Sequence, residues 1–364
     1  MNSEKIGYIE AIALIAVVMI NKIVLNTPRE IIASTGSSAW INVIYISVIS
    51  IFISWLIATL FKKFQDKDIL DVSEFLGGKT LKIIIGSLYF ISLILVPTFV
   101  VKNFAETLKL IYYRTSPLIY VLLFFIIASL IANMFSSLKT LAKVNLLVIP
   151  AVLASIVIIL FSSARNFVPE RIFPLLGYGA NETFLSGLSN LFSFSGIAYL
   201  LLLNPLIDKP SNLKKISIIS IIISAVYLFL SVTCILLSLS FTFKSGEPLS
   251  LYSLTRNLEY GRFIQRVDAI FILIWLLSTL SYVSIALFFC INIFKKLTNI
   301  SSSKYLNYSI HLLVLALLLI PVNYTNYNNK IGSIIKILAT VLIFGISLLI
   351  LIFANVKLKV KQSS

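Results

Sequence analysis

The 364-residue sequence has few of the side chains that build metal sites and catalytic centres: two cysteines, Cys234 and Cys290, and one histidine, His311. The cysteines lie in apolar runs without C-x-x-C spacing, so we expect small buried side chains rather than a disulfide or a metal site. One histidine cannot serve a Ser/His/Asp triad without further partners, and neither an H-E-x-x-H motif nor a paired-carboxylate cluster occurs. We expect His311 to pack between helices rather than to relay protons. The sequence therefore predicts that the chain is not an enzyme and holds no metal or cofactor.

Charged residues are also scarce, at 12% of the chain against 59% hydrophobic residues, and the mean hydropathy is +1.01. Because charges are costly inside a bilayer, they are expected in short connections between apolar runs of about 20 residues. The connections are too short to build a core of their own, so residues 1–364 are expected to form one all-α membrane domain. Ten spans are expected, at about 8–27, 38–61, 81–108, 117–135, 144–163, 183–204, 215–241, 264–292, 305–324 and 331–354.

Acidic residues are fewer than basic ones, 14 against 30, which gives a formal net charge of +16. More of the lysines and arginines fall in the connections on the side of the N-terminus than on the opposite side. The positive-inside rule then predicts that both termini are cytoplasmic, which agrees with an even number of spans. The first span has no cleavage site of a signal peptide and is expected to be retained. Anionic lipid head groups account for the excess of positive charge, so no nucleic acid partner is expected.

Polar residues interrupt the first span, in the stretch MINKIVLNTP (19–28), where Asn21, Lys22, Asn26 and Pro28 occur within an apolar run. This pattern predicts an interruption of the helix around Asn21 and Lys22. Irregular backbone at membrane depth is tolerated only where it lines a cavity or is buried in protein, so a ligand site is one interpretation. The alternative is that Lys22 extends to the outer membrane surface from the end of its span.

The sixth span carries a similar interruption in LFSFSGIAYLLLLNP (191–205), where Ser193, Ser195 and Gly196 follow one another closely. Residues 8–163 and 183–354 each hold five expected spans, so the two interruptions occupy corresponding positions. Broken helices at such positions indicate a transporter-type site at mid-membrane. The free N–H groups of one half-helix attract a carboxylate, and the free carbonyls of another attract an ammonium. Close packing through small residues is the alternative reading of the sixth span.

Three stretches carry a family resemblance: VPERIFPLLGYG (168–179), LLLLNPLIDKPSNLKK (200–215) and RFIQRVDAIFILIWLLS (262–278). With the ten-span layout, the chain resembles the membrane-spanning B subunits of spore germinant receptors. These are spore germination permeases of the amino acid–polyamine–organocation superfamily. The resemblance implies a five-plus-five inverted repeat of the amino acid permease (LeuT-like) type with broken first and sixth helices. It also implies a place in the spore inner membrane, sensing of a nutrient germinant, commonly an amino acid, and partner A and C subunits.

Carried over to this sequence, the resemblance places the ligand between Asn21 and Lys22 of the first span and a group of sixth-span residues. That group comprises Ser193, Phe194, Ser195 and Gly196. Relatives often have a glycine–acidic pair in the sixth span, where this chain reads Ser195-Gly196-Ile197. An ammonium group here is therefore expected to rely on carbonyls and hydroxyls.

Other charges fall within or at the ends of spans. Lys102 and Glu106 lie four residues apart in the third span, on one helix face, where an ion pair is the first expectation and a proton or cation path the second. Asp268 lies beside Arg266 at the entrance to the eighth span. We expect it to anchor the helix end, with Arg262 as a candidate second partner, or to take part in the same path.

Three function classes fit this sequence. The first is a receptor subunit in which a small amino-acid-like ligand shifts the membrane bundle between two states and the change reaches partner subunits. The second is a secondary amino acid transporter coupled to H⁺ or Na⁺. The third is a structural partner whose pocket no longer binds a ligand. The resemblance favours the first, and the fold expected from it also suits the second.

Overall fold

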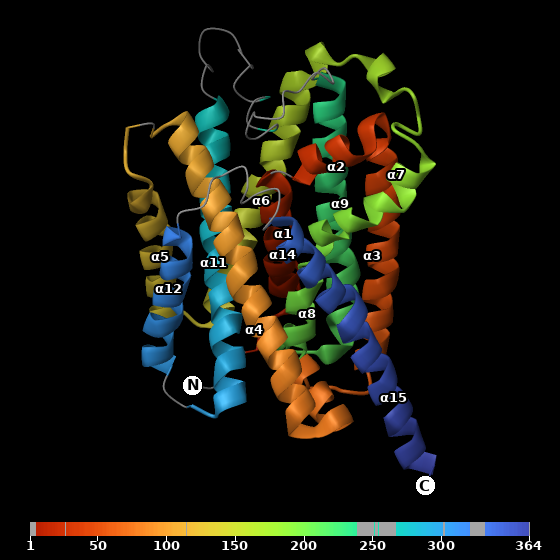
Figure 1. Ribbon diagram of the computed structural model, residues 1–364, viewed down its shortest axis with the longest axis vertical. Helices are drawn as coiled ribbons and strands as arrows, with labels where there is room; N and C mark the ends of the chain where they lie inside the picture. Colours follow the sequence, from red (N-terminus) through yellow and green to blue (C-terminus); the bar gives the residue numbers. More distant parts are fainter. Residues whose placement is uncertain are drawn as a thin grey trace.

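The computed structural model describes residues 5–25, 27–113, 115–238, 251, 254, 267–300, 303–320 and 332–363. Regular structure in these ranges is helical, apart from one isolated parallel β-bridge between Ile6 and Ile207. Most of the long helices run side by side along the long axis of the molecule (Figure 1). The expected all-α fold class is therefore confirmed.

The helices overlap each of the ten expected spans. The first part of the chain forms α1 (Tyr8–Leu25), α2 (Thr27–Thr35), η1 (Gly36–Ser38), α3 (Ala39–Phe61), α4 (Ile69–Ile111), α5 (Leu118–Phe135), α6 (Leu138–Ser163), η2 (Ala164–Asn166) and η3 (Pro169–Ile172). The second part forms α7 (Ala180–Phe184), η4 (Ser186–Phe194), α8 (Ile197–Leu203), η5 (Asn204–Leu206), η6 (Pro210–Asn212), α9 (Leu213–Ser238), α11 (Val267–Thr298), α12 (Ser303–Leu319), α14 (Gly332–Thr340), η8 (Val341–Ile346) and α15 (Ser347–Ser363). Most η elements are 3-10 helices, and η8 is a π-helical stretch.

Seven helical stretches within the described residues are long and apolar enough to cross a membrane. An eighth is reached if the pair Ala180–Phe194 and Ile197–Leu206, bent by 45°, is taken as one span. The count of ten crossings stays a prediction.

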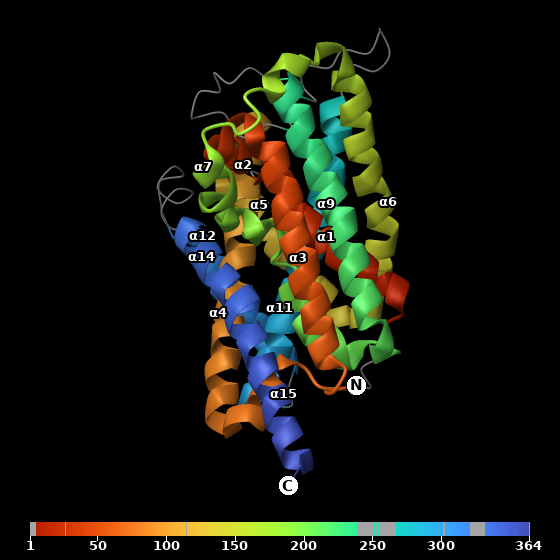
Figure 2. The ribbon, with the colours of Figure 1, turned by 90° about the vertical axis from the view of Figure 1, so that its right-hand side faces the viewer.

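The outer surface of the bundle is apolar, and its centre is α1. Phe135 on α5 is 82% exposed, and Leu147 on α6 is 79% exposed. Large apolar side chains exposed in this way on many helices suit a surface that faces lipid. By contrast, every residue from Ala13 to Ile20 of α1 is at most 3% exposed. Helices α6, α9 and α11 pack around α1, so its side chains can form a site that lipid does not reach (Figures 1 and 2).

Helix α4 is broken near its start at Gly77 and Gly78. Gly78 has φ 71° and ψ −167°, a left-handed conformation that glycine adopts without the steric cost of a Cβ atom. The residues before the break form a short helix whose N-terminus is capped by Asp68, because its carboxylate accepts hydrogen bonds from the backbone of Leu70 and Asp71. The long part of α4 begins after the glycines.

Both ends of the described chain lie at one end of the molecule, below in Figure 1, which we call the termini end. Lys5 forms an ion pair with Asp66 at 3.2 Å, just after α3. From α15, Lys357 donates hydrogen bonds to the carbonyls of Phe75 and Leu76, at 3.0 and 2.8 Å. The start and the end of the chain therefore contact the same segment, residues 62–76, which we call the α3–α4 connection.

Two further segments are fastened to the α3–α4 connection. Asn204, where α8 passes into η5, donates its side-chain amide to the carbonyls of Phe64 and Lys67, at 3.0 and 2.8 Å. Lys296 near the end of α11 forms ion pairs with Asp68 at 2.7 Å and Asp71 at 2.6 Å. The connection therefore joins four segments that are distant from one another in sequence.

Candidate functional site

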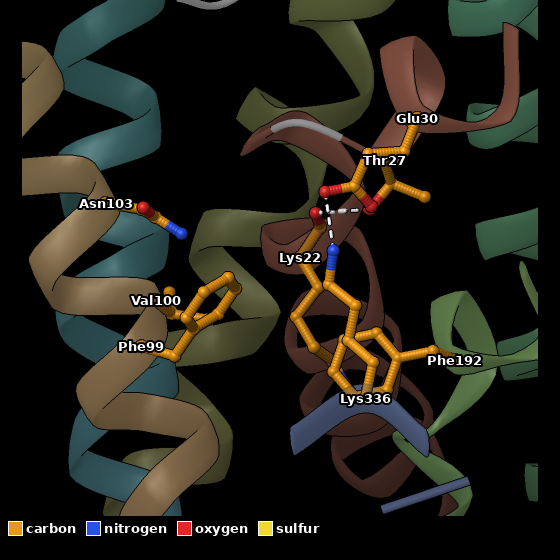
Figure 3. A pocket seen from close by; sticks show the side chains of 8 residues that line it. All are labelled: Lys22, Thr27, Glu30, Phe99, Val100, Asn103, Phe192 and Lys336. Carbon is orange, nitrogen blue, oxygen red and sulfur yellow. Dashed lines mark hydrogen bonds and ion pairs between the residues drawn. The ribbon is translucent and has the colours of Figure 1, made fainter. Parts of the chain in front are cut away.

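A cavity lies on the side of α1 that faces α4 and α14, close to the point where α1 gives way to α2 (Figure 3). Its empty volume is about 310 Å³, including the space at its opening. Its lining residues come from five helical elements: Lys22 of α1, Thr27 and Glu30 of α2, Phe99, Val100 and Asn103 of α4, Phe192 of η4, and Lys336 of α14.

Lys22 connects the two interrupted segments that the sequence singled out. It is only 5% exposed, and its ammonium donates a hydrogen bond of 2.5 Å to the hydroxyl of Ser195, which follows η4. The same nitrogen lies 5.4 Å from the centre of the Phe192 ring, within the range of a cation–π contact. Lys22 therefore points into the protein at the junction of α1 and η4 and does not extend to the outer surface.

Gly196 allows α1 and the bend between η4 and α8 to approach closely. A Cβ atom added to Gly196 would lie 2.5 Å from Cγ and 3.2 Å from Cε of Met19. Ser193 and Phe194 do not line the cavity: the Ser193 hydroxyl donates to the carbonyl of Asn190, and Phe194 is fully buried. Of the sixth-span residues predicted to bind the ligand, Ser195 is thus the one whose side chain bonds to a lining residue, and Gly196 determines the spacing.

The Asn21 side chain does not line the cavity and points instead toward α11. Its side-chain amide donates to the hydroxyls of Ser278 at 3.3 Å and Thr279 at 2.8 Å, both on α11. The predicted interruption of the helix at Asn21 and Lys22 is wrong, because α1 stays helical to Leu25. The amide nitrogen of Asn21 and the ammonium of Lys22 both have partners on neighbouring segments, so neither donor requires the backbone to open around it. Asn26, also part of the predicted interruption, lies outside the described residues.

Thr27, at the start of α2, contributes to the end of α1. Its hydroxyl donates a 2.9 Å hydrogen bond to the carbonyl of Lys22, one of the last-turn carbonyls that lack a partner within their own helix. This bond fixes the chain where it changes from α1 to α2, next to the cavity. The break between the two helices therefore adjoins the lining residue Lys22.

An ion pair joins α2 to α14 across the cavity lining. Lys336 bonds to Glu30 at 2.5 Å, and its ammonium lies 5.6 Å from the Phe99 ring (Figure 3). The Glu30 side chain is 43% exposed, so the pair lies toward solvent, whereas Lys22 lies within the protein. Separating α2 from α14 requires this pair to break.

Asn103 of α4 is a lining residue with a free hydrogen-bond acceptor. The residue is 2% exposed, and its side-chain oxygen has no hydrogen-bond partner within the described residues. A buried polar atom without a partner is costly, and a bound molecule that donates a hydrogen bond would remove that cost. The cavity thus offers cations at Lys22 and Lys336, a carboxylate at Glu30 and a neutral acceptor at Asn103. This set suits a small ligand that carries both a carboxylate and an ammonium group.

The lining residues beyond Lys22 were not predicted from the sequence. Phe192 directly precedes the predicted sixth-span group, which begins at Ser193. Asn103 directly follows Lys102, which the sequence singles out by its charge. Glu30 and Lys336 are charged residues near the ends of apolar runs, which is a usable signal only once their helices are known to meet. Thr27, Phe99 and Val100 carry no signal of their own.

The charged residues predicted for an ion path lie apart from this cavity lining. Lys102 donates a 2.6 Å hydrogen bond to the carbonyl of Ile320, at the end of α12. Its ion pair with Glu106 stays a prediction. Asp268 accepts a 2.7 Å hydrogen bond from the hydroxyl of Tyr112, which joins the start of α11 to the end of α4. Arg262 and Arg266, its expected neighbours, lie outside the described residues.

The residues considered for metal and proton chemistry are buried. Cys234 on α9 and Cys290 on α11 are fully buried free thiols. His311 on α12 is 1% exposed, and its Nδ1 contacts the carbonyl of Asn307 at 2.8 Å. Within the described part of the chain, no three histidine, cysteine or acidic side chains come together in a way that could hold a metal ion.

Comparison with known sequences gives a family match over most of the chain. A family described as "Spore germination protein" (spore permease) matches residues 5–330. Spore germination protein B2 of Bacillus subtilis (strain 168) is 26% identical over 281 residues, which cover 75% of this chain and 74% of that protein. Spore germination protein KB of the same organism is 21% identical over 294 residues, which cover 79% and 77% respectively.

Comparison with solved structures finds transporters of the same fold. A Na⁺-coupled sialic acid symporter, solved in a substrate-bound outward-open state, has a TM-score of 0.65 at 11% identity and covers 93% of this chain and 78% of its own. Mhp1 in an inward-facing conformation has a TM-score of 0.61 at 13% identity, with 95% and 76% covered. A manganese transporter of Eremococcus coleocola scores 0.58 at 14% identity, with 94% and 76% covered. With the long apolar helices, this likeness identifies an integral membrane protein with a transporter fold.

Proposed function

We propose that this chain, which belongs to the spore germination protein family, is the germinant-sensing B subunit of a receptor in the spore inner membrane. In this proposal it binds a small amino-acid-like ligand in the cavity between α1, α4 and η4. It then passes a conformational change to A and C subunits. The family membership makes germination the context, and the cavity supports the choice of ligand.

The observation that carries the proposal is the bond between Lys22 and Ser195. It places a buried cation where α1, the bend after η4 and the cavity meet. A ligand carboxylate can take over this ammonium and form a charge-assisted hydrogen bond, stronger than the one to the neutral hydroxyl. The ligand's ammonium group can donate to the free oxygen of Asn103. Both ends of a small zwitterion then have partners.

The full architecture we propose is a single membrane domain of ten spans in two inverted repeats, residues 8–163 and 183–354. In it, α1 with α2 forms the broken first span, and η4 with α8 forms the broken sixth span. The 45° bend at Ser195 and Gly196 and the change of helix at Thr27 support this pairing. The termini end is the cytoplasmic side, in accordance with the lysine-rich connections there.

The same contacts suggest how binding changes the conformation. A ligand shifts an equilibrium only by its difference in affinity for the two states. When Lys22 moves from Ser195 to a carboxylate, one contact between α1 and the bend after η4 is lost and one to the ligand is gained. The Glu30–Lys336 pair joins α2 to α14 on the solvent side. Forming or breaking this ion pair accompanies the change between the two states. Partner subunits would register the resulting movement of α1 and α8.

The test uses the full chain, purified and reconstituted in lipid vesicles, with Lys22→Met as the variant and Lys143→Met as the control. Lys143 is an exposed lysine on α6, remote from the cavity lining. Binding of each proteinogenic amino acid is measured by thermal stabilisation. We expect at least one to stabilise the wild type and the control but not Lys22→Met. Equal stabilisation of all three proteins would contradict the proposed site.

A second measurement separates sensing from transport. Vesicles holding the wild-type chain are loaded with the amino acid that binds, and exchange of labelled amino acid is followed with and without a proton or Na⁺ gradient. A sensor binds without exchange, whereas accumulation driven by either gradient would identify a coupled transporter. In spores that hold the partner subunits, Lys22→Met should abolish germination by that amino acid while the protein still accumulates.

A further inference from the structure

Three lysine side chains surround a single aromatic ring at the termini end. The ammonium groups of Lys67, Lys357 and Lys361 lie 5.8, 5.5 and 5.6 Å from the centre of the Phe75 ring. Lys67 belongs to the α3–α4 connection, and the other two stand one helical turn apart on α15. Two segments nearly 300 positions apart in sequence thus contribute positive charge to one place.

The carboxylates of the connection are engaged with other lysines. Asp66 pairs with Lys5, Glu74 pairs with Lys82, and the two remaining aspartates pair with Lys296. The acidic side chains nearest to Phe75 in sequence therefore each have a lysine partner outside the cluster around the ring. An anion that enters this cluster would meet lysines without first displacing one of these ion pairs.

The cluster is held in place by a helix end. Lys357 donates to the carbonyls of Phe75 and Leu76, the last two residues before the break at Gly77. An ammonium group has three N–H donors, so two are used on these carbonyls and one can bond to an anion. Lys67 and Lys361 are exposed residues and can turn toward the same anion.

The cluster also lies at the edge of the apolar outer surface. On α15, Phe353 is 57% exposed and precedes Lys357 by one turn, and on α4, Ile84 is 51% exposed shortly after the glycine break. Figure 2 shows the ends of both helices at the termini end of the molecule. Lysines at such an edge suit the level where acyl chains give way to head groups, and basic residues at that level attract anionic lipids.

We propose that Lys67, Lys357 and Lys361 form a binding site for the phosphate group of an anionic phospholipid, with the Phe75 ring as its floor. The lipid's phosphate contacts the ammonium groups, and its acyl chains lie along the apolar surfaces of α4 and α15. The lipid thereby links the α3–α4 connection to α15. This site is separate from the germinant cavity and does not depend on the identity of the germinant.

The test is a lipid titration of the purified full chain, followed by native mass spectrometry to obtain the dissociation constant of the first bound lipid. The lipids are phosphatidylglycerol, which is anionic, and phosphatidylcholine, which is zwitterionic. The variant is Lys67→Gln/Lys361→Gln, which leaves the hydrogen bonds of Lys357 in place. The control is Lys209→Gln/Lys215→Gln, which removes the same charge from two exposed lysines, one between η5 and η6 and the other in the first turn of α9. Equal melting temperatures without lipid establish that both variants fold.

We expect the wild type and the control to prefer phosphatidylglycerol and the variant to lose about 25-fold in affinity, since each lysine contributes about fivefold. Equal losses in variant and control would overturn the site, because net charge alone would then explain binding. No loss in the variant would overturn it as well. Inorganic phosphate is added as a competitor. Two results together would assign the site to free phosphate and refute a lipid site. Phosphate would displace the lipid at the concentration at which phosphate binds on its own, and the protein would show no preference between the two lipids.

Discussion

Replacing Gly196 with alanine should change the ligand response without removing any polar group from the site. The new methyl group would lie 2.5 Å from Cγ of Met19, a distance that real Cβ atoms do not adopt. Cγ is close to the Met19 backbone, so a rotation at the tip of that side chain does not relieve the contact. Either Met19 must change its rotamer at χ1, or α1 or the bend after η4 has to move.

The size of the effect follows from the cost of overpacking, typically about 1–3 kcal/mol. If this cost falls on the state in which Lys22 contacts Ser195, the equilibrium between the two states shifts by roughly 5- to 150-fold. The assay is the concentration of amino acid that gives half-maximal germination or thermal stabilisation, measured for Gly196→Ala and wild type at equal protein levels. We expect a change within that range or loss of the response.

The double variant Met19→Ala/Gly196→Ala tests the cause. Met19→Ala removes Cγ and the atoms beyond it, so it should make room for the new methyl group and move the half-maximal concentration back toward the wild-type value. Residues in direct contact show interaction energies of about 0.5–3 kcal/mol in such cycles. An unchanged half-maximal concentration in Gly196→Ala, with normal accumulation, would refute the reasoning that this approach controls the response.

Three further predictions concern other parts of the molecule. In a double-mutant cycle of Glu30→Gln and Lys336→Met, the coupling in unfolding free energy should stay within about 0.2–1 kcal/mol, because the pair is partly exposed. The germinant should nevertheless dissociate faster from both single variants than from the wild type. Stronger coupling, or unchanged dissociation, would argue against a solvent-side closure. Asn103→Leu should raise the melting temperature of the ligand-free protein, since it removes an unpartnered buried oxygen, and should weaken amino acid binding; tighter binding would contradict the assigned contact. Gly78→Ala should destabilise by about 1–2 kcal/mol through its positive φ alone, because no atom beyond the adjoining helix backbone lies within 4 Å of an added Cβ. Gly345→Ala, which has equal space and no positive φ, should not destabilise in chemical denaturation.

Much of the fold follows from the lengths and positions of the apolar runs in the sequence. Apolar runs of bilayer length require helices, because a backbone in lipid must bond within its own segment. The resemblance to spore germination permeases is confirmed by the family match over residues 5–330. The sequence also identifies Lys22 and Ser195 as candidates for one site, because each is a polar residue in an otherwise apolar run.

The rest of the site could not be predicted, because it depends on helix rotation and on pairs far apart in sequence. Asn21 and Lys22 are neighbours, yet one donates to α11 and the other to Ser195. A helix turns by about 100° per residue, so adjacent side chains necessarily leave on different faces, and only packing decides which face meets the cavity. Glu30 and Lys336 are separated by 306 positions, and nothing in either local sequence identifies the other.

The α3–α4 connection has a mechanical consequence. It is bonded to the start of the chain through Asp66, to the end of α8 through Asn204, to the end of α11 through Lys296 and to α15 through Lys357. None of these segments can shift by a full hydrogen-bond length on its own unless its bond breaks or the connection moves with it. Motion on this side of the molecule is therefore concerted, and a neighbouring protein that touched the connection alone would sense four separate segments of the chain through a single point of contact.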